Sequence, residues 1–270
     1  FFQLIKILFV FDMLIFGKFS EFVYLKFQVS SFKLNHKVND LKLKKAETLI
    51  KIKRKDCFVP RNDIMKDLFG KAILDYQTNS SPENIITSTS ISEEDEMEVA
   101  YLFRSFDEMP AIEQKALQLA NGKTLDIGCG AGSHSLFLQN ERNIDVHSID
   151  ISKNAIQACS LRGLKNVQAI NVLDLENEKY DTILLLMNGT GIFETLEKST
   201  IYLQKLKSLL NPNGQILIDS SDIIYMFDED EDGGKWIPSD NYYGELTFSL
   251  QYKKEKEVDF PWLYMDYNTL

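Results

Sequence analysis

A glycine-rich turn followed at a distance by a carboxylate is the part of this sequence with the clearest chemical meaning. Glycines occupy positions 128, 130 and 132 of the segment TLDIGCGAGS (124–133). Glycine has no Cβ, so the backbone at these positions can turn tightly and approach a ligand closely. Asp150 stands 22 residues after Gly128, at the end of an apolar segment. A carboxylate placed there can accept hydrogen bonds from both hydroxyls of a ribose, so the two features together predict a site for a nucleoside-containing cofactor.

The residues around these glycines narrow the kind of cofactor. A dinucleotide-binding turn would have its third glycine at position 133, which is Ser133 here. Asp126, two residues before the first glycine, would repel a pyrophosphate but would attract a cationic ligand. No Gly-Lys-Ser/Thr triplet follows the glycines, which excludes a P-loop. A cationic nucleoside therefore fits better than NAD, and an NAD-dependent oxidoreductase is the weaker alternative.

Apolar and amphipathic segments alternate through the part of the chain that contains these residues. The pattern predicts strands at 123–128, 144–149, 167–172, 181–187 and 215–220, and helices at 133–140, 152–162 and 195–210. Strands separated by helices form right-handed crossovers and hence a mostly parallel sheet. We therefore expect an α/β protein with a Rossmann-like, doubly wound sheet and helices on both faces, in which the glycine turn and Asp150 share one edge.

Several segments of this chain resemble the class I S-adenosylmethionine-dependent methyltransferases, and from Met65 onward it resembles a small bacterial member. The matching segments are LDIGCGAGSHS (125–135), SIDIS (148–152), NVLDL (171–175), YDTILLLMNGTGIF (180–193) and LLNPNGQILID (209–219). The resemblance implies an enzyme that moves a methyl group from S-adenosylmethionine to an acceptor by in-line transfer. A catalytically silent module that binds S-adenosylmethionine is the alternative.

The resemblance also implies a role for individual residues. It places Asp150 at the ribose, Ile151 on the adenine face, and Asp174 with Leu175 at the adenine amino group. The residues expected along the methionine part are Asp126, Gly128, Cys129, Gly130 and Gly132, and Asn188 is expected to face the methyl group and the acceptor. Asp174 could instead be an exposed turn carboxylate, and Asn188 could be a turn or capping residue. We expect no metal site, and no residue stands out as a catalytic base.

Charge and cysteine content bear on the acceptor and on the compartment. Residues 65–270 carry a net charge of −17, which would repel a phosphate backbone, so a small-molecule acceptor is expected and a nucleic acid is not. The chain has three cysteines, too few and too scattered for a disulfide framework, which favours the reducing cytoplasm. The segment after residue 220 is rich in aromatic residues that could line an acceptor pocket or cap the sheet edge as a hairpin: Trp236, Tyr242, Tyr243 and Trp262.

The composition divides the chain into three parts. Residues 1–64 carry a net charge of +7, and their apolar run at 1–16 is interrupted by charges and shorter than a membrane span, so no stable membrane insertion is expected. We expect 1–64 to be a non-native or unstructured leader, with a basic membrane-surface arm as the alternative.

The rest of the chain divides near residue 123. We expect 65–122 to be a helical lead-in, with one helix beginning near Ser92 and running to Phe103. We expect 123–270 to be a methyltransferase domain truncated at its carboxyl end. Its last strands would then be missing, leaving an exposed sheet edge.

Overall fold

The computed structural model describes residues 6–10, 65–237 and 240–270. The expected leader, 1–64, lies outside the described residues except for 6–10, which form strand β1. Within the described ranges, no helix combines the length and the apolar composition needed to cross a membrane.

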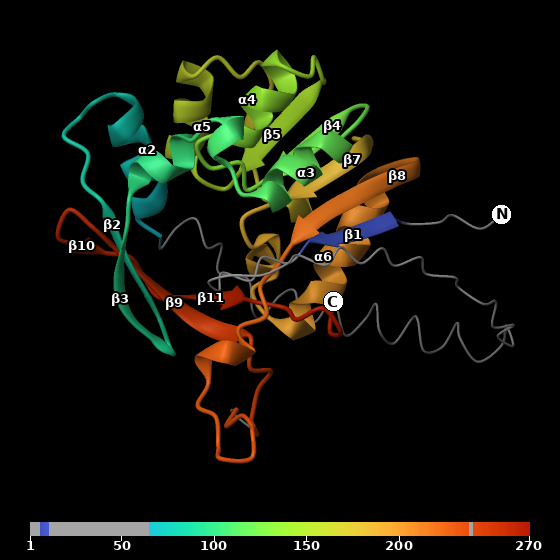
Figure 1. Cartoon of the computed structure of the whole chain (residues 1–270). Helices are drawn as coiled ribbons and strands as arrows, with labels where there is room; N and C mark the ends of the chain where they lie inside the picture. The colour runs from blue at the N-terminus through green and yellow to red at the C-terminus, as the bar shows by residue number, and fades with distance from the viewer. Residues whose placement is uncertain (1–5, 11–64, 238–239) are drawn as a thin grey trace, which may run out of the picture.

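A six-stranded parallel sheet forms the centre of the molecule (Figure 1). Its strand order is β1-β8-β7-β4-β5-β6. The strands are β1 (Lys6–Val10), β4 (Thr124–Ile127), β5 (Val146–Asp150), β6 (Val167–Ala169), β7 (Tyr180–Leu185) and β8 (Leu210–Asp219). The chain turns back in order at β4, so the carboxyl ends of β4, β5 and β7 meet at a switch point, where ligands bind in such sheets. The α/β, doubly wound class expected from the sequence is confirmed.

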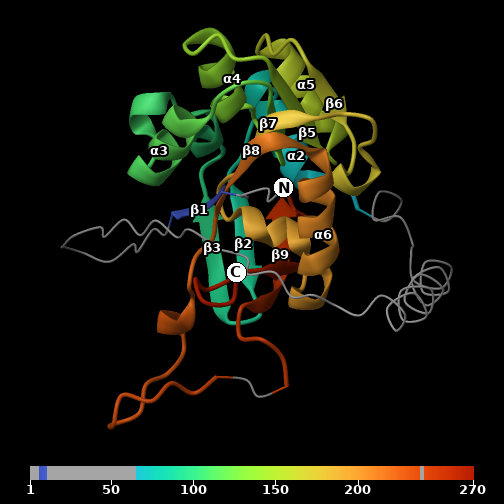
Figure 2. The same cartoon turned by 90° about the vertical axis from the view of Figure 1, so that its right-hand side faces the viewer.

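Helices lie on both faces of the parallel sheet (Figure 2). Alternate side chains of the central strands pack against these two layers. Ile183 and Leu185 pack in one core with α6 (Leu196–Leu209), whereas Leu184 packs in another core with α3 (Ala111–Leu119). The second core also receives α4 (Ser133–Asn140) through Leu138. This alternation follows from the two-residue period of a strand, and it explains why an almost continuously apolar run forms β7.

A smaller antiparallel sheet lies beside the parallel one (Figure 1). Its strand order is β10-β9-β2-β3, with β11 also paired to β9. The strands are β2 (Ile85–Thr89), β3 (Ser92–Met97), β9 (Glu245–Tyr252), β10 (Glu255–Lys256) and β11 (Phe260–Leu263). Helix α2 (Leu68–Gln77) packs on α5 (Lys153–Leu161) of the parallel layer and on β9 of the antiparallel sheet.

One sequence expectation is wrong in detail. The helix expected from Ser92 to Phe103 is instead strand β3 followed by the 3-10 helix η2 (Val99–Phe103), so the segment 65–122 is not helical throughout. The expectation that the sheet lacks its last strands stays a prediction; in the structure β8 pairs in parallel with β1. Strand β9 joins the antiparallel sheet through β2, a contact between distant parts of the chain that local patterning does not encode.

Candidate cofactor-binding site

The glycine turn joins β4 to α4 at the carboxyl edge of the parallel sheet. Gly128, Gly130 and Gly132 all have positive φ angles, of 71°, 52° and 81°. A Cβ on Gly132 would come within 2.9 Å of the Cys159 sulfur, so a side chain is excluded there by contact as well as by conformation. Beside Gly130 the nearest atom to such a Cβ is a methyl of Ile73 at 4.0 Å, which leaves room for a ligand along the backbone.

Asp150 ends β5 directly beside this turn. Its Oδ2 accepts a hydrogen bond from the Gly130 N–H at 3.0 Å, and its Oδ1 accepts one from the Ser152 N–H at 2.9 Å. Burial raises the pKa of Asp150, and the two backbone donors oppose that rise. The next residue, Ile151, keeps 41% of its surface exposed and offers an apolar face beside the carboxylate. A fixed carboxylate with lone pairs to spare and an apolar neighbour suits the ribose and base of a nucleoside.

Asp126 is buried on β4 and is tied to the start of α4. Its Oδ2 accepts a hydrogen bond from the Ser135 hydroxyl at 2.6 Å, and that hydroxyl accepts one from Ser148 at 2.7 Å. Burial raises the pKa of Asp126, while the charge of His134 lowers it. The carboxylate therefore belongs to a buried polar network next to the glycine turn.

A second buried network joins Glu113 of α3 to the same end of α4. Its Oε2 accepts a hydrogen bond from Arg104 Nη2 at 2.5 Å and lies 2.6 Å from His134 Nε2. Burial favours a higher pKa for Glu113, but the hydrogen bonds and charges of His134 and Arg104 outweigh it and hold that pKa below its ordinary value. Arg104 Nε is buried and has no hydrogen-bond partner among the described residues.

Sequence reasoning missed this buried network of Arg104, Glu113 and His134. They come from different segments and lie in no shared motif, so only the folded chain brings them together.

Cys129 contributes to the glycine turn through its backbone. Its N–H donates to the Ile149 carbonyl at 3.1 Å, while its sulfur lies 3.9 Å from the sulfur of Cys159 on α5. The contact with Cys159 and burial together raise the pKa of the Cys129 thiol well above its ordinary value. A protonated thiol that faces a helix acts as a packing group. Cys129 therefore supports the glycine turn through its backbone and packs its side chain against α5.

The structure places Asp174, Leu175 and Asn188 after strands of the same sheet. Asp174 ends the 3-10 helix η4 (Val172–Asp174) after β6 and is exposed, whereas Leu175 is buried. Asn188 follows β7 with a φ of 59°, and its Nδ2 donates to the Leu263 carbonyl at 3.3 Å. Its Oδ1 accepts a hydrogen bond from the Ser220 hydroxyl at 3.3 Å. These bonds connect the ends of β7, β8 and β11.

The four aromatic residues singled out near the carboxyl end do not gather into one pocket. The Trp262 ring lies so close to Gly191 that a Cβ there would meet it at 2.0 Å. The Tyr243 hydroxyl donates to Asp222 at 2.8 Å, just beyond β8. Trp236 keeps 73% of its surface exposed in the segment that projects from the body in Figure 1.

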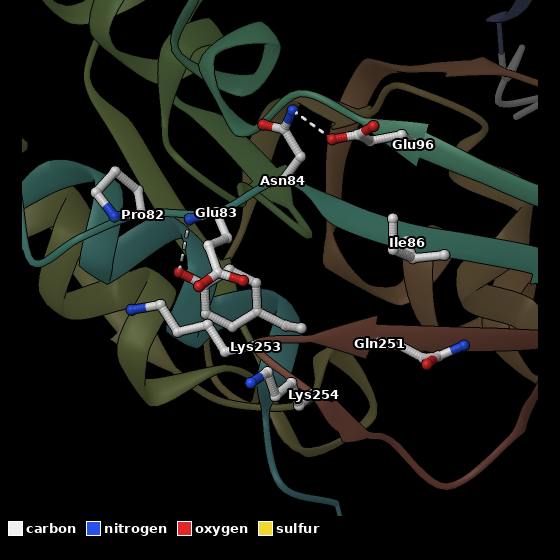
Figure 3. Close-up of a pocket in the computed structure, with 9 residues that line it drawn as sticks. Pro82, Glu83, Asn84, Ile86, Glu96, Gln251, Lys253 and Lys254 are labelled. Atoms are coloured by element: carbon white, nitrogen blue, oxygen red, sulfur yellow. Dashed lines mark hydrogen bonds between the residues drawn. The ribbon is translucent and has the colours of Figure 1, made fainter.

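A cavity of about 450 Å³ lies on the antiparallel sheet, apart from the glycine turn (Figure 3). It is lined by Pro82, Glu83, Asn84, Ile86, Glu96, Gln251, Tyr252, Lys253 and Lys254. Two of its polar groups bond to each other, since the Asn84 amide donates to Glu96 Oε1 at 2.9 Å. None of the residues predicted for the cofactor lines it.

Comparisons with known proteins show the family to which this chain belongs. A sequence-family profile described as a methyltransferase domain matches residues 118–257. The chain is 41% identical to a S-adenosylmethionine-dependent methyltransferase from Bacteroides fragilis, whose crystal structure contains S-adenosyl-L-homocysteine. That match has a TM-score of 0.70 and covers 78% of this chain and 85% of that one.

More distant structures are also similar to this chain. The structure of DesVI from Streptomyces venezuelae is 12% identical, with a TM-score of 0.44 over 59% of this chain and 78% of that one. A search of curated proteins gives no match. The profile and the Bacteroides fragilis structure carry the assignment: the chain belongs to the S-adenosylmethionine-dependent methyltransferases and is an enzyme that uses S-adenosylmethionine as its cofactor.

Proposed function

We propose that this enzyme transfers the methyl group of S-adenosylmethionine to a small-molecule acceptor at the carboxyl edge of the parallel sheet. The observation that carries the proposal is the carboxylate of Asp150, which is fixed by one N–H from the glycine turn and one from the start of α5. Each oxygen keeps a lone pair for a ribose hydroxyl, and charge-assisted bonds of this kind are strong.

The other assignments follow from position along this edge. The backbone of Gly128, Cys129, Gly130 and Gly132, with Asp126 beside it, would hold the methionine part, and Ile151 would pack on the adenine. The Asp174 carboxylate is exposed and could accept from the adenine amino group, with Leu175 packing behind it. Asn188 bonds to β11 and to Ser220, so we infer that it shapes the acceptor side of the crevice through these contacts.

The protein's task in this reaction is to position the reactants and to exclude water. Bound S-adenosylmethionine supplies a methyl group that is already activated by its sulfonium centre. The residues around the turn align it for in-line attack, which accounts for most of the rate that a protein can add to such a transfer. We assign no general base. The net charge of −17 over residues 65–270 supports a small-molecule acceptor over a nucleic acid.

The cytoplasm is the compartment that we infer for this reaction. Cys129 and Cys159 are free thiols in the structure, and a reducing compartment keeps thiols in that state. Cell fractionation with an antibody against the protein checks this inference, and recovery in an oxidising compartment would overturn it.

Calorimetry with S-adenosylhomocysteine, with NAD as the comparison ligand, tests the cofactor site. We expect Asp150→Ala to raise the dissociation constant for S-adenosylhomocysteine by about a hundredfold or more, because two charge-assisted hydrogen bonds are lost. Asp145→Ala is the matched control, since Asp145 is exposed and precedes the opposite end of the same strand. Wild-type affinity in Asp150→Ala would refute the ribose assignment.

Methylation assays with a panel of metabolites test the transfer itself. Radiolabelled S-adenosylmethionine is supplied with each candidate acceptor, and label in a product identifies the acceptor. Tight binding of S-adenosylhomocysteine with no turnover on any acceptor would favour a silent binding module instead.

A further inference from the structure

Helix α2 begins after Asp67, whose side chain forms hydrogen bonds to another helix. Asp67 occupies the N-cap position of α2 in the left-handed conformation, with a φ of 57° and a ψ of 43°, and its side chain makes no capping bond to α2. That conformation is unfavourable for a residue with a Cβ and persists where the surroundings hold it. Here the contacts that hold Asp67 come from α5.

The carboxylate of Asp67 sits at the N-terminus of α5. Its Oδ2 accepts hydrogen bonds from the Ser152 hydroxyl and from Asn154 Nδ2, both at 2.9 Å, and lies 3.4 Å from the Asn154 N–H. The helix dipole favours a negative charge at this end. Gly70 lets the two helices come this close, because a Cβ there would lie 1.9 Å from the Ser152 oxygen.

Ser152 connects Asp67 to the cofactor site. Its hydroxyl donates to Asp67, and its N–H donates to Oδ1 of Asp150 at 2.9 Å. The peptide that aims one oxygen of Asp150 is therefore anchored from the opposite side by a residue 85 positions away in the sequence. No described residue of the glycine turn performs this task, since Gly130 holds only the other oxygen.

We propose that Asp67 is a positioning residue of the cofactor site: it anchors Ser152 and Asn154, and so keeps the Asp150 carboxylate directed at the ribose. The proposal rests on the ribose assignment of Asp150 made above. Asp67 does not itself touch the cofactor. By holding the 150–152 segment in place, Asp67 lowers the entropic cost of ordering that segment when the cofactor binds.

The opposite side of α2 supplies a matched control. Asp75 belongs to the same helix, but its Oδ2 accepts hydrogen bonds from Lys253 Nζ at 2.7 Å and from the Tyr252 hydroxyl at 3.1 Å, on the antiparallel sheet. Asp75→Asn therefore removes the same charge from the same helix and disturbs the docking of α2 without reaching Ser152.

Calorimetry on the full chain with S-adenosylhomocysteine and with methylthioadenosine tests the proposal. We expect Asp67→Ala to raise both dissociation constants by about tenfold, since the lost contacts amount to one or two charge-assisted hydrogen bonds acting indirectly. Asp67→Asn should give a smaller rise, because its amide oxygen can still accept from Ser152. Asp75→Asn should bind both ligands as the wild type does, even where its melting temperature falls.

Ser152→Ala keeps the N–H that bonds Asp150 and removes the hydroxyl, which donates to Asp67 and also accepts the Ala155 N–H as the N-cap of α5. We expect it to weaken binding at least as much as Asp67→Ala, and the double variant to be no weaker than Ser152→Ala alone. Wild-type affinity in folded Ser152→Ala and Asp67→Asn would overturn the proposal, even if Asp67→Ala failed to fold. Loss of binding in Asp150→Ala in the same series would then show that the ribose assignment stands and that only the role of Asp67 is wrong.

Discussion

Asp219 shows how one carboxylate can shape the turn that follows β7. It ends β8, and its two oxygens accept the N–H groups of Met187 and Gly189, each at 3.0 Å. Within this turn, Met187 and Asn188 both have left-handed backbone conformations, with φ angles of 65° and 59°. This conformation costs about 1–2 kcal/mol for a residue such as Met187 and less for an asparagine, so an external acceptor helps to hold the turn.

The ionisation of Asp219 predicts how stability changes with pH. Burial raises its pKa to about 6, against an ordinary value of 3.8, while the N–H of Gly189 opposes the rise. The folded state therefore binds more protons than the unfolded state between these values, and stability falls as the pH rises through this window. A shift of this size corresponds to about 3 kcal/mol.

Urea unfolding between pH 4 and pH 7 measures this effect. We expect the free energy of unfolding of wild type to fall relative to that of Asp219→Asn by about 3 kcal/mol across the window. Asp266→Asn is a control, because the ionisation of Asp266 changes stability with pH in the opposite direction. Burial favours a higher pKa for Asp266, but hydrogen bonds from Thr269 and Tyr242 hold that pKa below its ordinary value. The stability that ionised Asp266 contributes is therefore lost as the pH falls. A pH-independent difference for Asp219→Asn would contradict the prediction.

Sequence patterning could indicate those residues of the candidate site whose places depend on local structure. The glycine turn and Asp150 could be predicted because a strand, a tight turn and a helix within one crossover fix their places. Asp67 and Glu113 could not, because each acts through a partner on a distant segment: Asp67 meets Ser152, and Glu113 meets His134. Neither position carries a local signal that distinguishes it from an ordinary helix carboxylate.

At the scale of elements, α2 is held at its first turn from two directions. Asp67 reaches α5, and the buried carboxylate of Glu257 accepts the N–H groups of Lys66 at 2.8 Å and Leu68 at 3.1 Å. Those N–H groups are free of intrahelical partners at a helix start, so a capping acceptor stabilises it. Glu257 lies between β10 and β11, which ties the antiparallel sheet to the parallel layer through α2.

Two glutamates in this region allow the cap to be tested against a surface ion pair. We expect Glu257→Ala to lower the free energy of unfolding by about 2 kcal/mol, because one buried and one partly buried N–H group lose their acceptor. Glu255→Ala should change it by less than about 1 kcal/mol, since its pairs with Lys66 and Lys71 are exposed. Urea denaturation measures both, and hydrogen exchange at α2 should accelerate in Glu257→Ala alone. Equal effects of the two substitutions would contradict this account of the cap.

The elements that sequence patterning misassigned are those whose partners lie far away. Every helix and strand predicted between residues 123 and 220 is present, most with shifted ends, because each carries its own periodicity. The acidic segment that forms β3 has no such periodicity. It becomes a strand by pairing with β2, which also pairs with β9 from the other end of the chain. Such context overrides local preference in sheets.

For the whole molecule, binding of the cofactor product should stabilise the fold by mass action. S-adenosylhomocysteine at about a hundred times its dissociation constant adds about 2.7 kcal/mol. In a protein of this size that raises the melting temperature by about 5–10 °C. Scanning calorimetry measures the shift, with NAD at the same concentration as the negative control. No shift with S-adenosylhomocysteine, or an equal shift with NAD, would contradict the site described here.

The acidic strand β3 has a consequence for how copies of this protein behave in a crowded solution. Among the described residues β3 pairs only with β2, so its outer backbone groups could extend the sheet into a neighbouring copy. Four successive carboxylates, from Glu93 to Glu96, are exposed along it. Two such strands repel each other when ionised, which guards the open edge against self-association. Acid or concentrated salt removes this repulsion, so precipitation under those conditions would begin at this strand.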